Sequence, residues 1–123
     1  MTTRTPCLLL VDDDATIRST LARVLAEEGK EVALAATAEE ALALLTEGLR
    51  PGFILLDLTM PGMNVADFML QRAELSGARR IPVFVFSATR GAQDRVSSLG
   101  ADGYVPKPVN LEDILELVER HSG

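Results

Sequence analysis

The sequence predicts an α/β domain built on a doubly wound sheet of five parallel strands. Three observations predict it. Short aliphatic runs alternate five times with helical apolar patterns, most of these runs end in a polar residue, and a length of 123 residues suits one domain. A hydrophobic content of 47% argues against a disordered chain, and a single cysteine excludes a disulfide framework. We therefore take residues 1–123 as one domain.

The chain is acidic, with 18 Asp and Glu residues against 12 Lys and Arg residues and a net charge of −6. An acidic surface repels phosphate groups, so we expect no direct contact of this domain with nucleic acid. The apolar run Cys7–Val11 is shorter than the apolar region of a signal peptide, which needs about 7–15 residues. We expect a cytoplasmic protein that does not bind a membrane.

The first half of the chain contains three predicted strands and two predicted helices. Strands are expected at residues 8–11, 32–35 and 53–56, because these runs are short, apolar and bounded by polar or turn residues. The helices between them are predicted from apolar residues at steps of three and four: Ile17, Leu21, Val24 and Leu25 in the first, and Ala38, Ala41, Leu42 and Leu45 in the second. Thr37 is a plausible N-cap, and Gly29 a plausible helix end.

The second half continues the alternation. A helix is expected over residues 65–75, a strand over 81–86 and a short helix over 92–99, followed by a short strand at 103–105. The last helix is predicted from an apolar stripe: Leu111, Ile114, Leu115 and Val118. The strand runs at 32–35 and 103–105 are the least apolar, as edge strands are, so the strand order 2-1-3-4-5 fits best. His121 lies among the final residues, which we expect to be frayed.

Polar residues follow the central strands, where α/β sheets bind their ligands. Asp12 and Asp13 follow the first strand, Asp57 the third, Ser87 the fourth and Lys107 the fifth. Three carboxylates at one edge repel one another, and a hard divalent cation relieves that repulsion. The sequence therefore predicts a Mg²⁺ site, with Mn²⁺ as an alternative ion. A carboxylate beside a cation and a lysine is suited to accepting a phosphoryl group.

Four motifs carry a resemblance to a known family. They are Leu10–Asp14, Leu55–Met63, Phe86–Ala88 and the pair Lys107-Pro108. In this order on these strand ends, they resemble the response-regulator receiver domains of two-component signalling, and the likeness covers essentially the whole chain. The resemblance implies a flavodoxin-like fold. It also implies that the domain catalyses only its own phosphorylation and dephosphorylation and is not an enzyme acting on a metabolite.

The resemblance assigns a role to each site residue. Asp57 would be the phosphoacceptor. Asp13, Asp57 and the backbone carbonyl of Thr59 would bind Mg²⁺, and Asp12 would help to hold the ion. Lys107 would pair with a phosphoryl oxygen. Ser87 would contact the phosphoryl group, and Tyr104 stands at the aromatic switch position.

The implied partners are those of a phosphorelay. A histidine kinase or a histidine phosphotransfer protein would donate the phosphoryl group to Asp57. The surface formed by the fourth helix, fifth strand and fifth helix would then act on an output protein or domain, and a phosphorylation-dependent dimer is a further option.

Two other functions stay open. Asp12-x-Asp14-x-Thr16 also matches the motif of haloacid-dehalogenase-type phosphatases, in which Asp12 would be the nucleophile and Asp14 the acid/base. That family needs a further acidic pair late in the chain near a strand end, whereas Glu112-Asp113 lies at the start of the last predicted helix. The pair Asn64-Val65 stands where receivers often have Asp-Gly, which suits an interaction module that works without phosphorylation. Simpler roles are also open: helix capping for Asp14, a structural ion pair for Lys107 and plain packing for Tyr104.

Overall fold

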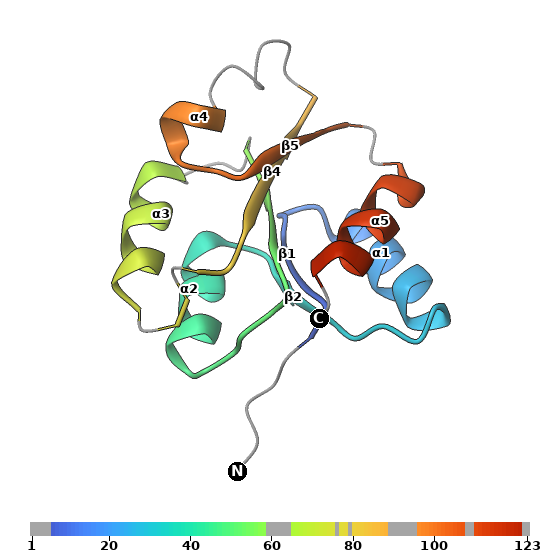
Figure 1. Cartoon of the computed structure of the whole chain (residues 1–123). Helices are drawn as coiled ribbons and strands as arrows, with labels where there is room; N and C mark the ends of the chain where they lie inside the picture. The colour runs from blue at the N-terminus through green and yellow to red at the C-terminus, as the bar shows by residue number, and fades with distance from the viewer. Residues whose placement is uncertain are drawn as a thin grey trace.

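The computed structural model describes residues 6–58, 65–75, 77–78, 80–88, 96–107 and 110–121. Its five strands form one parallel sheet in the order β2-β1-β3-β4-β5, which confirms the predicted order. The strands are β1 (Leu8–Val11), β2 (Val32–Ala35), β3 (Ile54–Asp57), β4 (Val83–Ser87) and β5 (Gly103–Pro106). The helices are α1 (Ala15–Glu27), α2 (Ala38–Thr46), α3 (Val65–Glu74), α4 (Val96–Leu99) and α5 (Leu111–His121) (Figure 1).

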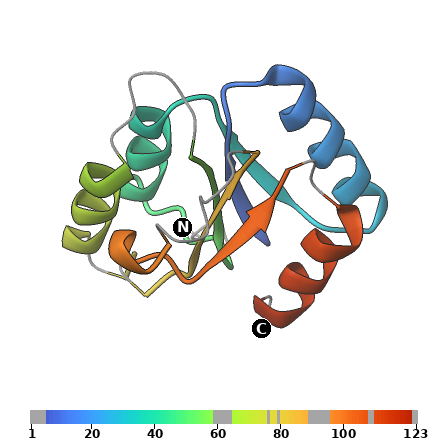
Figure 2. The ribbon, with the colours of Figure 1, turned by 90° about the horizontal axis from the view of Figure 1, so that it is seen from above.

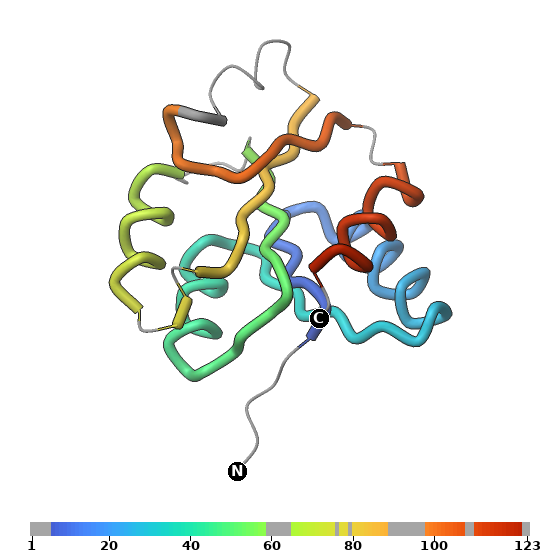
Figure 3. The backbone as a smooth tube through the Cα atoms, viewed as in Figure 1, coloured from blue at the N-terminus to red at the C-terminus, as the bar shows by residue number. Residues whose placement is uncertain are grey.

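The helices form two layers around the sheet. Helices α1 and α5 cover one face, and α2, α3 and α4 cover the other, as the view from above makes clear (Figure 2). The backbone trace shows the chain passing from α1 to the other layer, where it forms α2, α3 and α4, and returning to form α5 (Figure 3). No helix among the described residues has the length and apolar character needed to cross a membrane.

Side-chain alternation along β1 explains its unbroken aliphatic run. Leu9 and Val11 belong to the core cluster on the α2–α3 side, whereas Leu8 and Leu10 belong to the cluster on the α1–α5 side. All four side chains are fully buried. A central strand of a parallel sheet must be apolar on both faces for this reason.

The register of the strands brings their polar ends to one edge of the sheet. Val11 pairs with Leu56, so the residues that follow β1 lie beside the end of β3. Asp57 pairs with Phe86, and Ser87 pairs with Pro106, so the ends of β3, β4 and β5 are also aligned. The predicted site residues are therefore delivered to the same edge.

The helix termini follow the sequence signals. The Asp14 side chain accepts hydrogen bonds from the N–H groups of Thr16 and Ile17, which makes it the N-cap of α1. Thr37 caps α2 in the same way, by accepting from the N–H of Glu40. Gly29 follows α1 with a φ of 76°, in the left-handed region that favours glycine.

Several predicted boundaries and one predicted face need correction. Strand β3 is shifted one residue later than predicted, to Ile54–Asp57, and β5 extends one residue further, to Pro106. Strand β4 begins at Val83 and not at residue 81, because Pro82 has no N–H for a ladder and Ile81 donates to Ala78 in a turn. The apolar face of α5 includes Leu117, which is buried, whereas Leu111 is 36% exposed. Helix α3 ends at Glu74, one residue before the predicted end. Residues 92–95 of the predicted fourth helix lie outside the described residues.

Candidate functional site

Three carboxylates meet at the carboxyl edge of the sheet. Asp12 and Asp13 follow β1, and Asp57 is the last residue of β3. Each offers one oxygen within 4.8 Å of the oxygens of the other two. Asp12 and Asp57 are buried, and Asp13 is exposed at the mouth of the group. The predicted acidic cluster is therefore present in the structure.

Asp12 has the most constrained environment of the three. The N–H of Asp14 donates to its Oδ1 at 2.9 Å, whereas its buried Oδ2 has no hydrogen-bond partner among the described residues. The pKa of Asp12 is raised to about 6, mainly by burial and also by the nearby charge of Asp57. The Asp14 N–H and the Lys107 ammonium act in the opposite direction, because each favours the carboxylate.

The donor set fits a hard divalent cation. Three carboxylate oxygens lie close together, and the Oδ2 atom of Asp12 is a buried acceptor to which no residue in the described part of the chain donates. Mg²⁺ prefers such oxygen ligands and keeps several waters that a substrate oxygen can replace. Thr59, whose carbonyl was predicted as a further ligand, lies outside the described residues.

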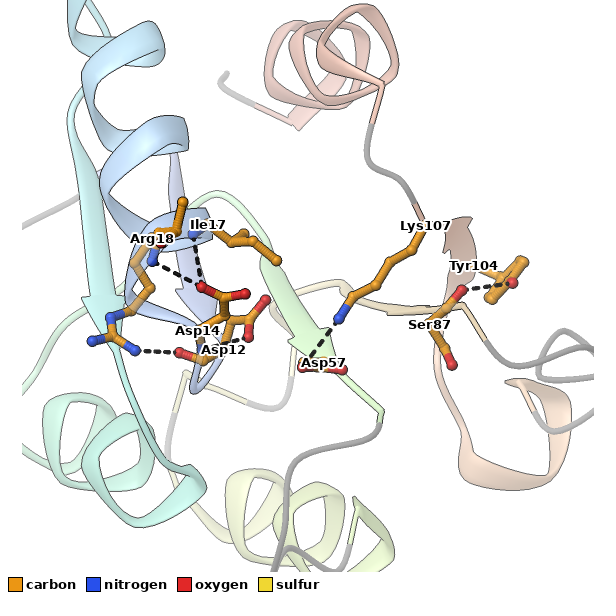
Figure 4. A network of polar contacts seen from close by, with 9 residues as sticks. Asp12, Asp14, Ile17, Arg18, Asp57, Ser87, Tyr104 and Lys107 are labelled. Carbon is orange, nitrogen blue, oxygen red and sulfur yellow. Dashed lines mark hydrogen bonds and ion pairs between the residues drawn. The ribbon is translucent and has the colours of Figure 1, made fainter.

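Lys107 extends over the sheet edge to the carboxylate cluster (Figure 4). Its Nζ lies 3.3 Å from Oδ2 of Asp57, and the two side chains are 19% and 3% exposed. The same ammonium lies 4.8 Å from the centre of the Phe86 ring. Lys107 therefore touches a carboxylate and an aromatic face at once.

Ser87 and Tyr104 form a second group beside Lys107. Ser87 is fully buried at the end of β4. Its main-chain carbonyl accepts a hydrogen bond from the Tyr104 hydroxyl at 3.0 Å and one from the Lys107 N–H at 3.1 Å. The Tyr104 ring packs against the core cluster on the α2–α3 side. The structure thus links the two residues predicted as a switch through one backbone carbonyl (Figure 4).

Two residues that contact the site were missed from the sequence. Arg18 donates from Nη1 to the main-chain carbonyl of Asp12 at 2.7 Å, and its place in the first turn of α1 is the signal that could have indicated it. Phe86 lies beneath Lys107, and the alternation of β4 could have placed it on the same face as Asp57.

The residues of the phosphatase alternative do not converge. Glu112 and Asp113 are exposed in the first turn of α5 and do not belong to the acidic group found among the described residues. Asp14 caps α1, as its simpler role predicts.

His121 is part of α5, where fraying was expected. Its ring lies 5.8 Å from that of Phe53 and 5.5 Å from that of Phe84. These aromatic contacts hold the last turn of α5 against the sheet and explain why the helix continues to residue 121.

Comparisons with known proteins agree with this geometry. The sequence matches the family model described as the response regulator receiver domain over residues 8–119. It is 37% identical over 110 residues to the response regulator MprA of Mycolicibacterium vanbaalenii, covering 88% of this chain and 46% of that protein. It is 39% identical over 110 residues to the transcriptional regulatory protein CpxR of Klebsiella pneumoniae, covering 88% and 45%. The chain therefore spans about half the length of the curated relatives it matches.

A solved structure extends the likeness to the fold. The chain superposes on the chemotaxis protein CheY4 of Vibrio cholerae with a TM-score of 0.79 and 28% sequence identity. The superposition covers 98% of this chain and 99% of that chain.

Proposed function

Because the chain belongs to the response regulator receiver family, we propose that it is a switch controlled by phosphorylation of Asp57. The observation that carries the proposal is the environment of this one carboxylate. Asp57 is buried, ends a central strand, shares an acidic cluster with Asp12 and Asp13, and pairs with Lys107. An aspartate with a purely structural role would not need both two neighbouring carboxylates and the ammonium group of a lysine.

The donor in this proposal is a phosphohistidine on a histidine kinase or a histidine phosphotransfer protein. An oxygen of Asp57 attacks the phosphorus, a P–O bond forms, and the P–N bond breaks. The histidine nitrogen leaves with the electron pair of that bond and takes up a proton. Water later attacks the phosphorus, which releases inorganic phosphate and restores the Asp57 carboxylate. The domain processes no external metabolite.

The acidic residues and Lys107 would each help to place positive charge beside the phosphoryl oxygens. Asp12, Asp13 and Asp57 would hold Mg²⁺, which when bound supplies positive charge beside the phosphoryl oxygens. Lys107 supplies a second positive charge from the other side of Asp57. Ser87 donates from its hydroxyl to a phosphoryl oxygen. Thr59 contributes its carbonyl to the metal site, as the family resemblance implies.

Tyr104 connects the site to the proposed output surface. When Ser87 moves toward the phosphoryl group, its carbonyl moves as well, and the hydrogen bond from Tyr104 changes with it. A cavity of about 250 Å³ lies beside Tyr104 and is also lined by Leu117 and Arg120 of α5. The surface of α4, β5 and α5 is thus the region whose shape responds, and an output protein or domain, or a second copy of the chain, would read it. This domain itself makes no contact with nucleic acid.

The experiment is to label the protein with acetyl phosphate and Mg²⁺ and to map the modified residue by mass spectrometry. We expect the label on Asp57 and its loss in Asp57→Asn. Asp102→Asn is the matched control, because Asp102 lies at the opposite end of β5 and accepts a hydrogen bond from the Val83 N–H. Label on Asp12 would overturn the proposal in favour of a phosphatase. An unlabelled protein that also fails to bind millimolar Mg²⁺ would support an interaction module.

A further inference from the structure

The Lys107 ammonium has two neighbours of different character. The Asp57 carboxylate lies 3.3 Å away, and the Phe86 ring centre lies 4.8 Å away, within the range of a cation–π contact. Phe86 is fully buried, and the Lys107 side chain is 19% exposed. The buried ring therefore forms a rigid surface beneath a long side chain that is itself mostly buried.

The sheet register explains why this ring meets this lysine. Phe86 pairs with Asp57 on one side and with Val105 on the other. Lys107 is two residues beyond Val105, and its N–H continues the ladder by donating to Ser87. Side chains two residues apart on a strand share a face, so Asp57, Phe86 and Lys107 lie on the same face of the sheet. The contact follows from backbone geometry.

The two neighbours respond differently to a change at Asp57. Asp12, Asp13 and Asp57 could hold a divalent cation, which would offset the negative charge of the carboxylate that attracts Lys107. The attraction of the aromatic ring does not depend on that charge, because it arises from the ring quadrupole. The ammonium of a lysine is carried on a flexible chain of four carbons, so it moves away readily once its ion pair weakens.

We propose that Phe86 is a positioning residue for Lys107: its ring holds the ammonium at the carboxyl end of β3 when the charge of Asp57 is shared with a cation. The catalytic part of this inference rests on the proposed function, since it takes Lys107 as the group that meets the incoming phosphoryl oxygens. The contact itself does not rest on that function and is tested separately.

The first experiment measures the contact by NMR. The chain contains two lysines, Lys30 and Lys107, so protein labelled with ¹³C and ¹⁵N at lysine gives one signal of interest and one internal reference. We expect the Lys107 ε-methylene protons to be shifted upfield by the Phe86 ring, both without metal and at saturating Mg²⁺. In Phe86→Leu, we expect saturating Mg²⁺ to move this signal to the position of a mobile lysine. An unshifted Lys107 signal in the unsubstituted protein would overturn the proposal.

Fluorinated phenylalanine at position 86 removes the concern that a leucine disturbs the buried core. Successive fluorination weakens the ring quadrupole at nearly constant shape. The same series at Phe53 is the matched control, because Phe53 is equally buried in the same core cluster and contacts Phe84 and His121. We expect the Lys107 signal at saturating Mg²⁺ to move stepwise with fluorination at Phe86 and to stay unchanged with fluorination at Phe53.

The second experiment follows the rate at which acetyl phosphate labels Asp57. Full fluorination at Phe86 is expected to lower the rate constant about two- to fivefold at saturating Mg²⁺, whereas the Phe53 series leaves it unchanged. If the unsubstituted protein is labelled but the Phe86 series leaves the rate unchanged, the positioning role fails and the proposed function stands. If the unsubstituted protein is not labelled at Asp57, the proposed function fails, and the NMR series still decides whether Phe86 holds Lys107.

Discussion

The buried carboxylate of Asp12 destabilises the folded state electrostatically when it is charged. Its native pKa of about 6 exceeds the ordinary value of 3.8, mainly because the carboxyl group is buried. The native state therefore binds this proton more tightly than the unfolded state does. The contribution of Asp12 to the free energy of unfolding therefore decreases as pH rises from about 4 to about 6. At higher pH the carboxyl group is charged in the folded state, and its destabilising effect is complete.

Asp12→Asn tests this cost because it removes the charge and keeps an oxygen that can accept from Asp14. In chelator at about pH 8, we expect the variant to be more stable than the unsubstituted protein by on the order of 1–3 kcal/mol. Urea denaturation at several pH values measures the difference, which should shrink toward about pH 4. A difference that is constant across this range would contradict the assignment.

At the residue scale, the acidic group was predictable because strand order alone brings Asp12, Asp13 and Asp57 to one edge. The roles of Arg18 and Phe86 were harder to predict. Arg18 donates to a main-chain carbonyl, so its position in the first turn of α1 is the only sequence signal for this contact, and the residue type of its partner gives none. In the sequence, Phe86 does not differ from the other buried strand residues, and only the strand register shows that it pairs with Asp57.

The N-cap of α2 offers a test of local stability that does not involve the carboxylates of the acidic cluster. The Thr37 hydroxyl accepts a hydrogen bond from the Glu40 N–H at 3.1 Å. Thr37→Ala leaves that N–H without its partner and is expected to lower the free energy of unfolding by about 1 kcal/mol. Urea denaturation measures the loss. Thr37→Ser should restore most of it, and equal losses for both variants would rule out a capping role.

The edge strand β5 depends on close packing against Phe84. A Cβ atom on Gly103 would lie 2.6 Å from Cε2 of the Phe84 ring, so one of the two must move. We expect Gly103→Ala to destabilise the protein by about 1–3 kcal/mol. A double-mutant cycle with Phe84→Leu provides the control, since the smaller side chain should reduce the penalty. Additive effects of the two substitutions would argue against this contact.

At the element scale, the alternation of strands and helices was predictable, and several boundaries were not. Leu111 and Leu117 illustrate the reason for α5. Both residues suit an apolar face, and only the direction from which the helix meets the sheet decides that Leu117 is buried and Leu111 is exposed. That direction depends on tertiary packing.

At the scale of the whole molecule, the proposed metal site is expected to couple to global stability. A ligand that binds only the native state raises the free energy of unfolding, by about 2.7 kcal/mol at 100 times its dissociation constant. We expect Mg²⁺ to produce such an increase in urea denaturation experiments and Asp13→Ala to reduce it strongly. Asp14→Ala should lower the baseline stability through loss of the α1 cap and retain the Mg²⁺ increment. Equal loss of the increment in both variants would contradict the ligand assignment.

The main-chain carbonyl of Ser87 links residues whose side chains lie on opposite faces of the sheet. Lys107 and Asp57 belong to the α1–α5 face, and the Tyr104 ring packs with the opposite core. Within the described part of the chain, the oxygen of residue 87 accepts from the Lys107 N–H, which continues the strand ladder, and from the Tyr104 hydroxyl. A peptide plane turns as a unit. Rotation of this one plane would therefore change both hydrogen bonds, so the lysine backbone and the tyrosine hydroxyl would respond to the same movement.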